Sequence, residues 1–447
     1  MEKEVSVLSA PQAPRRSDVP ANDQRPARPG AFPRLWRSRV TGCLQGLATG
    51  RLCLQDAASS WVFGPTDGGG PTAEIRVEDD RFYRTLCLEG TLGAADAYLK
   101  GWWNSQDLVG LFRLLTRNRD VLGAVDGVLA QLARGLNAWG HFLRRNTVRG
   151  SRRNIAAHYD LGEDFYALFL DETMTYSAGV FLRPDSTLAD SSREKYDRIC
   201  RKLELTPYHH ILEIGTGWGG FALHAAQHYG CRVTTTTISR RQYQHARDRV
   251  RQARLEPRIT VLSDDYRNLT GVYDHLVCVE MVEAVGHQYL DRFFGQCSRL
   301  LRPDGLMLLQ AITLPDHRFA QYVRSVDFIQ KYIFPGGCLP SIGAIAAAVG
   351  QTTDFRFLHL EDFGYHYAQT LAHWRQRFWQ NIDKVRSLGF DERFIRMWHY
   401  YLCYCEAGFL ENQIGVAQIL LAKPYCKRRP LLWIDDPTGT AGRKAST

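Results

Sequence analysis

The stretch ILEIGTGWGGFALHAA, residues 211–226, has the pattern of a β-strand, a glycine-rich turn and the start of an α-helix. Gly215, Gly217 and Gly219 let the backbone approach a ligand closely, and the first N–H groups of the helix would point at that ligand. With Gly220 the spacing also matches G-x-G-x-x-G, the fingerprint of dinucleotide-binding folds. The stretch therefore predicts a cofactor site at the carboxyl end of a strand.

The choice of cofactor depends on the acidic residues around this turn. A nicotinamide cofactor calls for an acid about 20 positions further on, at the end of the next strand. That strand reads VTTTTIS at 233–239 and contains no acid. Glu213 instead precedes the first glycine in the order E-x-G-x-G-x-G, which is typical of methyltransferases. The pattern favours S-adenosylmethionine.

Beyond residue 205, short apolar strands alternate with helical segments, which indicates a wound, mostly parallel sheet. The expected strands are 210–215, 233–239, 259–264, 275–281, 306–312, 355–360 and 418–422. Seven strands match the class I methyltransferase (Rossmann-like) fold, so we predict an α/β fold of this type. An aromatic-rich insertion at 315–354 and a helical stretch at 365–410 are expected to cap the carboxyl ends of the strands.

The chain of 447 residues is too long for one ordinary core and suggests several domains. We expect a disordered tail at 1–38, a small α+β domain at 39–118, which the family resemblance described below associates with lipid, and an amphipathic helix with a basic linker at 119–153. The catalytic domain would span 154–424, followed by a basic, flexible tail at 425–447.

The charge balance is basic, with 56 Lys and Arg against 47 Asp and Glu, which fits an anionic partner. Arginines cluster in the linker, at Arg144, Arg145, Arg149, Arg152 and Arg153. This cluster is either a solvated linker or a strip that binds an anionic membrane surface. No apolar run approaches the ~18 residues of a membrane span. No nucleic-acid-binding motif is present, so we expect no nucleic-acid partner.

The eleven cysteines follow neither disulfide nor zinc spacings, which favours a reducing compartment. We therefore expect a cytoplasmic protein that associates peripherally with membranes. Glu283 and His287 have the spacing of a metal-binding pair, but no further ligands accompany them, so we expect no metal.

Several motifs together resemble the cyclopropane-fatty-acyl-phospholipid synthase family. They are NIAAHYDLGEDFYALFLDETMTYSAGVF at 154–181, EMVEAVGH at 280–287, KYIFPGGCLPS at 331–341, HYAQTLAHW at 366–374 and YYLCYCEAGF at 400–409. The resemblance extends over roughly 40–424 and includes the small N-terminal domain. It implies transfer of a methyl group from S-adenosylmethionine to a cis double bond of an unsaturated phospholipid acyl chain.

The resemblance also implies which residues act. The carbocation left by methyl transfer would lose a proton to a bound bicarbonate and close a cyclopropane ring. Glu283 and Tyr367 match the family's bicarbonate ligands, and Gln310 stands where the family commonly has histidine. Cys405 matches the cysteine commonly marked as the active residue. Glu280 has no such role by resemblance, so we assign it to structure or support.

The cofactor contacts implied by the resemblance come from four segments. They are Tyr176 and Ser177; Gly215, Thr216 and Gly217; Thr237, Ile238 and Gln242; and Tyr266 and Arg267. Ala178 departs from the family, which often has cysteine there.

Other interpretations stay open at this point. Cys405 would otherwise be a buried structural thiol, and Tyr367 a core aromatic bonded to backbone. The same mechanism could give a methylene- or methyl-branched lipid, or a relative of this fold could methylate a small amine. A non-catalytic lipid-binding protein is the remaining alternative, and a homodimer is compatible with each.

Overall fold

The computed structural model describes residues 31–66, 69–120 and 161–428. These residues form two compact units. The small unit holds 31–120 together with Ala372–Glu411, and the large unit holds 161–371 and 412–428. The expected amphipathic helix and arginine cluster at 119–153 lie almost wholly outside the described residues, as do most of both expected tails.

A seven-stranded sheet forms the centre of the large unit, in the order β10-β11-β9-β8-β5-β6-β7. Its strands are β5 (His210–Ile214), β6 (Arg232–Thr236), β7 (Ile259–Leu262), β8 (Tyr273–Val279), β9 (Leu301–Thr313), β10 (Arg356–Asp362) and β11 (Gly415–Ala422). The strands from β9 to β7 run parallel, whereas β11 runs antiparallel to both of its neighbours. The predicted α/β fold and all seven predicted strands are confirmed.

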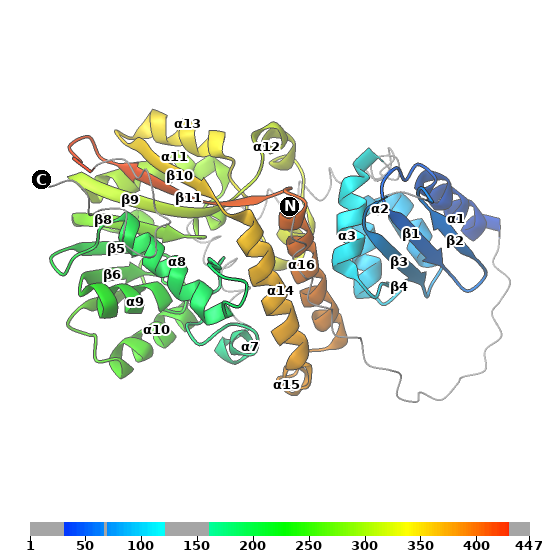
Figure 1. The fold of residues 1–447 in the computed structure, drawn as a ribbon, viewed down its shortest axis with the longest axis horizontal. Coiled ribbons are helices and arrows are strands. Elements are labelled where there is room, and N and C mark those ends of the chain that lie inside the picture. Colours follow the sequence, from blue (N-terminus) through cyan, green and yellow to red (C-terminus); the bar gives the residue numbers. More distant parts are fainter. Residues whose placement is uncertain (1–30, 67–68, 121–160, 429–447) are drawn as a thin grey trace, which may run out of the picture. The chain divides into compact units, whose positions relative to one another are not determined.

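Helices cover both faces of this sheet, as Figure 1 shows. The helices α8 (Leu188–Lys202), α9 (Gly220–Tyr229) and α10 (Arg240–Gln252) cover one face, and α11 (Leu290–Arg299) and α13 (Ile342–Thr352) cover the other. Along β8, Leu276 and Cys278 pack toward α11 and α13, while Val277 packs toward α8 and α9. Because both faces are buried, the second half of the strand, Leu276–Val279, is a continuous apolar run.

The remaining segments of the large unit connect these layers. They are α7 (Glu163–Ala167), α12 (Asp316–Tyr322), 3₁₀ turns at Tyr266–Asn268, Val282–Ala284 and His287–Tyr289, and a π-helical turn at Ile329–Ile333. The expected insertion thus lies between β9 and β10 and supplies α12 and α13. Helix α13 packs on a face of the sheet because Ile345, Ala348 and Val349 are buried there.

The small unit contains a second sheet in the order β2-β1-β3-β4. Its strands are β1 (Arg51–Gln55), β2 (Ser60–Phe63), β3 (Thr72–Val77) and β4 (Trp103–Asn104). Its helices are α1 (Ala31–Leu44), α2 (Arg81–Leu99), α3 (Leu108–Arg117), α15 (Ile382–Ser387) and α16 (Glu392–Leu410), and α14 (Gly364–Gln380) belongs partly to each unit.

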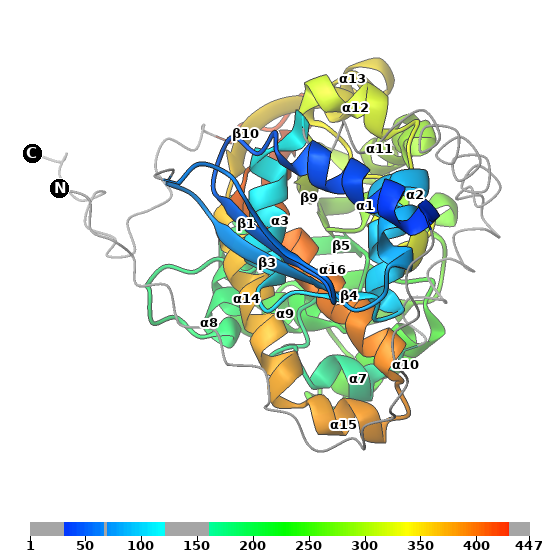
Figure 2. The ribbon, with the colours of Figure 1, turned by 90° about the vertical axis from the view of Figure 1, so that its right-hand side faces the viewer.

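Helix α16 packs along α3 in the small unit (Figure 2). The guanidinium of Arg396 lies 3.9 Å from the centre of the Tyr98 ring and donates to the carbonyl oxygens of Tyr98 and Trp103. Just after α16, the Glu411 carboxylate accepts hydrogen bonds from α3. These contacts explain why a segment late in the chain belongs with the first strands.

Helix α1 begins at Ala31, inside the stretch 1–38 that the sequence suggested as a tail. Arg37 forms ion pairs with the buried Asp56 and with Asp80, at 3.0 Å each, and Val40 is buried. These contacts hold the helix on the small unit. No helix within the described residues has the length and apolar character needed to cross a lipid bilayer.

Candidate active site

The glycine turn follows β5 and has the backbone shape that glycine permits. Gly215, Gly217 and Gly219 have φ angles of +102°, +52° and +88°. The N–H groups of Gly215 and Thr216 donate to the carbonyl oxygen of Thr236 on β6, which fixes the turn to the sheet. A Cβ at Gly217 would meet nothing within 4 Å, so the turn borders open space. This cradle fits the cofactor that the sequence predicts.

Glu213, the acid before the turn, is buried and ties the two strands together. Its carboxylate accepts a hydrogen bond from Thr235 Oγ1 at 2.6 Å, and the same hydroxyl lies 2.7 Å from Thr216 Oγ1. Burial raises the pKa of Glu213 to about 8, against the opposing effects of Thr235 and the Lys195 charge. This carboxyl is therefore linked to the turn through the Thr235 hydroxyl.

Tyr176 and Ser177 lie on the loop before α8. The Ser177 hydroxyl accepts a hydrogen bond from Lys195 Nζ at 2.6 Å. Burial lowers the pKa of Lys195 to about 8, although Glu280, Asp171 and Glu213 each act to raise it. Lys195 therefore places a cation among buried carboxyl groups.

Aromatic rings pack around Tyr176, one of the predicted cofactor contacts. The ring of Tyr166 lies 5.1 Å from Tyr176 and 5.5 Å from Trp218, and Phe169 packs against both tyrosines. Such ring faces can stabilise a nearby cation. Both a sulfonium and a carbocation would gain from this lining.

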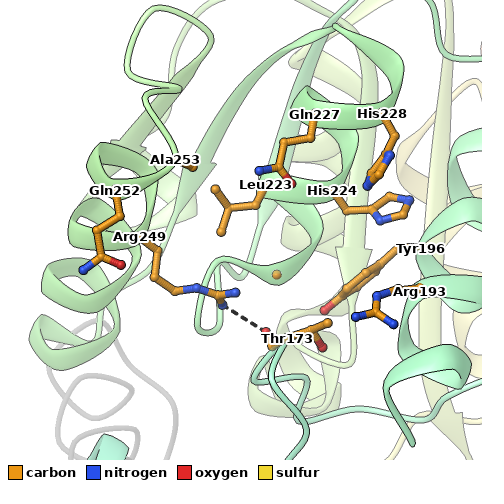
Figure 3. Close-up of a pocket in the computed structure, with 11 residues that line it drawn as sticks. Thr173, Arg193, Tyr196, Leu223, His224, Gln227, His228, Arg249, Gln252 and Ala253 are labelled. Carbon is orange, nitrogen blue, oxygen red and sulfur yellow. Dashed lines mark hydrogen bonds between the residues drawn. The ribbon is translucent and has the colours of Figure 1, made fainter. Parts of the chain in front are cut away.

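Arg249 on α10 joins the loop to the glycine turn. Its guanidinium donates to the carbonyl oxygens of Thr173, at 3.0 Å, and Trp218, at 2.9 Å. Figure 3 shows the Thr173 bond at the edge of a pocket of about 380 Å³. None of the predicted catalytic or cofactor residues lines that pocket, so it is separate from the candidate site.

The predicted cofactor segment with Thr237, Ile238 and Gln242 follows β6. Thr237 Oγ1 donates to the Gln242 side chain at 2.8 Å, and both residues are buried, whereas Ile238 is half-buried. Ser239 caps α10 by accepting from the Gln242 N–H. The segment is therefore held in a fixed shape at the carboxyl edge of the sheet.

The predicted cofactor segment with Tyr266 and Arg267 follows β7. Arg267 binds Asp265 through two hydrogen bonds, of 2.7 and 2.6 Å, and both side chains are buried. Tyr266 is half-buried and its ring packs on Phe293. The Arg267 guanidinium thus shapes this loop through Asp265.

Glu280 is the point where the predicted catalytic residues meet. Its Oε1 accepts hydrogen bonds from Gln310 Nε2, at 2.7 Å, and from the Ala178 N–H, at 2.9 Å. Its Oε2 accepts one from the Tyr367 hydroxyl at 2.7 Å. Burial raises the pKa of Glu280, opposed by Lys195 and by these three donors. The residue as a whole is half-buried.

Glu283 has different surroundings. Its Oε1 accepts the Ile312 N–H at 2.6 Å, and its Oε2 is buried without a hydrogen-bond partner among the described residues. Burial, followed by the charge of Glu280, raises the pKa of Glu283 to about 8. Three hydrogen-bond donors favour the charged form of Glu280, whereas one donor and the charge of its neighbour favour the protonated form of Glu283.

The N-terminal part of α14 carries Tyr367 and is fixed to the loop that carries Ala178. Thr370 Oγ1 accepts the Gly179 N–H at 3.1 Å. His366 Nδ1 accepts the Phe181 N–H at 3.1 Å. The tyrosine and the backbone donor at Ala178 are therefore positioned together.

The residues expected to hold a bicarbonate do not fit that group. Gln310, Tyr367 and the Ala178 N–H already donate to a carboxylate of the chain itself. A second anion there would face the Glu280 charge without these donors. We therefore assign no step to bicarbonate.

Cys405 lies on α16 of the small unit and is half-buried. The structure brings Gln310, Tyr367 and Glu283 into one region of the large unit, whereas Cys405 belongs to the other unit. Its catalytic role stays a prediction. Among the described residues no cluster of three or more His, Cys, Asp or Glu side chains is arranged to hold a metal ion.

The sequence analysis did not place the side chains of Glu280 and Lys195 within the candidate active site. The signal for Glu280 was present, because an acid at the end of an apolar strand needs partners. The signal for Lys195 was absent, since a lysine in a polar helix usually faces solvent.

The mostly parallel sheet, the glycine turn and the acidic cluster at the carboxyl edge define a class I S-adenosylmethionine-dependent methyltransferase. Among solved structures, the mycolic acid cyclopropane synthase CmaA1 complexed with SAH and CTAB is 33% identical, with a TM-score of 0.57. That match covers 61% of this chain and 98% of CmaA1.

Residues 146–419 match the family model described as mycolic acid cyclopropane synthetase. The tuberculostearic acid methyltransferase UfaA1 of Mycobacterium tuberculosis is 38% identical, over 83% of this chain and 87% of the relative. The cyclopropane-fatty-acyl-phospholipid synthase of Escherichia coli K12 is 33% identical, over 79% of this chain and 89% of the relative. The chain belongs to the cyclopropane synthase family of S-adenosylmethionine-dependent methyltransferases.

Proposed function

We propose that this enzyme transfers a methyl group to a cis double bond of an unsaturated phospholipid acyl chain and forms a cyclopropane ring. The observation that carries the proposal is the hydrogen-bonded cluster of Glu280, Gln310 and Tyr367 beside the glycine turn. Methylation of an alkene leaves a carbocation that must lose a proton, and this cluster offers an oriented carboxylate. The relatives whose names specify a lipid product support the same substrate class.

When bound, S-adenosylmethionine supplies an electrophilic methyl group. The cofactor would be held by the glycine turn and by three further segments. The residues are Gly215, Thr216 and Gly217 in the turn, and Tyr176, Ser177, Thr237, Ile238, Gln242, Tyr266 and Arg267 in the other segments. The rings of Tyr166, Phe169, Tyr176 and Trp218 would exclude water and stabilise positive charge. Lys195 would keep the Ser177 hydroxyl oriented.

A methylene- or methyl-branched lipid is the second candidate product. Gln310 stands where the family commonly has histidine, and UfaA1 is named for a product other than a cyclopropane. A 1,2-hydride shift would move the positive charge to the methyl-bearing carbon. Loss of a proton from the methyl group would then give a methylene-branched chain, the precursor of a methyl-branched one. The substrate and cofactor are shared by the two candidates, so only the product separates them.

The test uses purified full-length protein, labelled S-adenosylmethionine and vesicles of monounsaturated phospholipid. We expect the released fatty acids to gain one CH₂ unit and to lose the double bond, as measured by mass spectrometry. A gain of CH₂ with an alkene retained would select the branched product. Absence of label in lipid, with cofactor still bound, would contradict the proposed function.

We also propose a cytoplasmic enzyme that meets an anionic membrane at its surface. The basic net charge of +9 supports attraction to anionic lipid. Acyl chains lie within the bilayer, so a peripheral enzyme needs some means of docking there.

A further inference from the structure

The Glu280 carboxylate lies where three hydrogen-bond donors of the site converge, and we call this place the anion position. Its three donors are Gln310, Tyr367 and the Ala178 N–H. The resemblance assigns Tyr367 to bicarbonate and places Gln310 at the family's histidine position. A carboxylate and a bicarbonate present the same pair of acceptor oxygens, so one can replace the other in such a pocket.

The backbone conformation of Glu280 directs its carboxylate toward these three donors. Its φ angle of +48° is in the left-handed region, which non-glycine residues rarely adopt and which costs about 1–2 kcal/mol. The Glu280 N–H donates to the Gln310 carbonyl at 2.8 Å, which holds this conformation. Strained backbone retained at a ligand site points to a functional demand on the side chain.

A chain of buried groups fixes which atom of Gln310 faces Glu280. Lys202 Nζ, which can only donate, bonds to Gln418 Oε1 at 2.6 Å. The Gln418 amide nitrogen must then donate to Gln310 Oε1, at 3.0 Å. The Gln310 amide nitrogen is therefore turned toward Glu280, and all three side chains are at most 1% exposed. A histidine at this position could gain or lose a proton, whereas a glutamine cannot.

The acceptor count leaves room for one proton. An ionised carboxylate has about four lone-pair sites. Two donors use Oε1, and Tyr367 uses one site on Oε2. The remaining site on Oε2 can accept a proton, and burial raises the pKa of this carboxyl, so the carboxylate is a stronger base than an exposed one.

We infer that Glu280 is itself the catalytic base of this enzyme and takes the place of a bound bicarbonate, an inference that rests on the proposed function. The alkene π pair forms the bond to the methyl carbon, and the electron pair of the broken S–CH₃ bond stays on sulfur. Glu280 Oε2 then takes a proton from the new methyl group, and the C–H pair closes the ring. Glu280 returns this proton to water after the product leaves.

The experiment measures lipid methylation in CO₂-free buffer and in buffer with added bicarbonate. The parent enzyme should run equally fast in both, because its base is part of the chain. Glu280→Gln should lower the rate by ~10²-fold or more in both buffers, the range for loss of a general base. Cofactor affinity, measured by calorimetry, should be retained in this variant, which also reports that it folds.

Glu280→Gly is the second variant. It removes the carboxylate, suits the left-handed backbone and leaves three donors to a small anion. We expect its activity to be low without bicarbonate and to rise when bicarbonate is added.

Glu204 supplies the matched control. It is an exposed glutamate of the large unit with a φ angle of +49°, so Glu204→Gln and Glu204→Gly repeat both substitutions outside the site. These variants should keep the parent rate.

Loss of parent activity in CO₂-free buffer, or full activity of Glu280→Gln, would overturn the inference while leaving the proposed function in place. A parent enzyme that labels no lipid in either buffer would instead refute the proposed function and the inference with it.

Discussion

Two acids three positions apart have opposite roles in the electrostatics of this site. Glu280 accepts three hydrogen bonds, whereas the Glu283 side chain accepts one, and its second oxygen is buried without a partner among the described residues. Two carboxylates near each other in a buried site do not both ionise readily, so one keeps its proton. The three donors favour Glu280 as the charged member of the pair.

Glu213 allows a prediction at the scale of one residue. Its carboxyl keeps a proton up to about pH 8 when folded, against an ordinary value of 4.5. The folded state therefore binds more protons across this window, so the free energy of unfolding falls as pH rises through it, by up to ~1.4 kcal/mol per unit. Glu213→Gln cannot ionise and should show a shallower fall, measured by urea unfolding without cofactor at several pH values.

The control for this prediction is Glu256→Gln, which changes an exposed glutamate of the same unit. It should follow the parent. An identical pH slope in the parent and in Glu213→Gln would show that the buried carboxyl does not hold its proton.

At the scale of elements, the glycine turn and α14 bring distant chain segments to one edge of the sheet. The turn borders open space at Gly217, and α14 presents Tyr367 while Thr370 holds the loop of Ala178. The site is therefore an assembly of segment ends. Each of them is fixed by hydrogen bonds made beside the residue that is predicted to act.

The turn can be tested by Gly217→Ala. The added methyl group would enter open space where the cofactor is expected, so we predict a loss of S-adenosylmethionine affinity of at least ~10-fold, about 1.4 kcal/mol. Calorimetric titration measures this directly. Gly101→Ala is the control, because Gly101 also has a positive φ, of +74°, and open space around it, but lies in the small unit.

Both variants should lose similar stability through left-handed strain, about 1–2 kcal/mol. If Gly217→Ala binds the cofactor as the parent does, the turn does not contact it.

At the scale of the whole molecule, the two compact units are not continuous stretches of the chain. Residues 372–411 return to the small unit, where Arg396 and Glu411 bind partners from α2, β4 and α3. The linear domain boundaries suggested by the sequence stay a prediction. Pairing of late helices with early strands is a tertiary property, since periodicity within a helix does not name its partner.

The arginine cluster allows a prediction for the whole molecule, although it lies outside the described residues. Replacing Arg144, Arg145, Arg149, Arg152 and Arg153 by glutamine should weaken binding to anionic vesicles by up to ~1 kcal/mol per arginine. Vesicle sedimentation at low and high salt measures this, and cofactor affinity should not change. Replacement of the same residues by lysine keeps the charge and should keep vesicle binding. Equal sedimentation of the glutamine variant would remove the cluster from any membrane role.

The sequence by itself determined the seven-stranded fold, the glycine turn and the family, because strand patterning, glycine spacing and motifs are local properties of the chain. It also indicated Gln310, Tyr367 and Glu283 as members of one site. Only the tertiary structure decided that Glu280 occupies the anion position. Its donors come from residues 30, 87 and 102 positions away, and its backbone angle is invisible in a list of residues. Hydrogen-bond partners at such separations follow from packing, which local patterns do not specify.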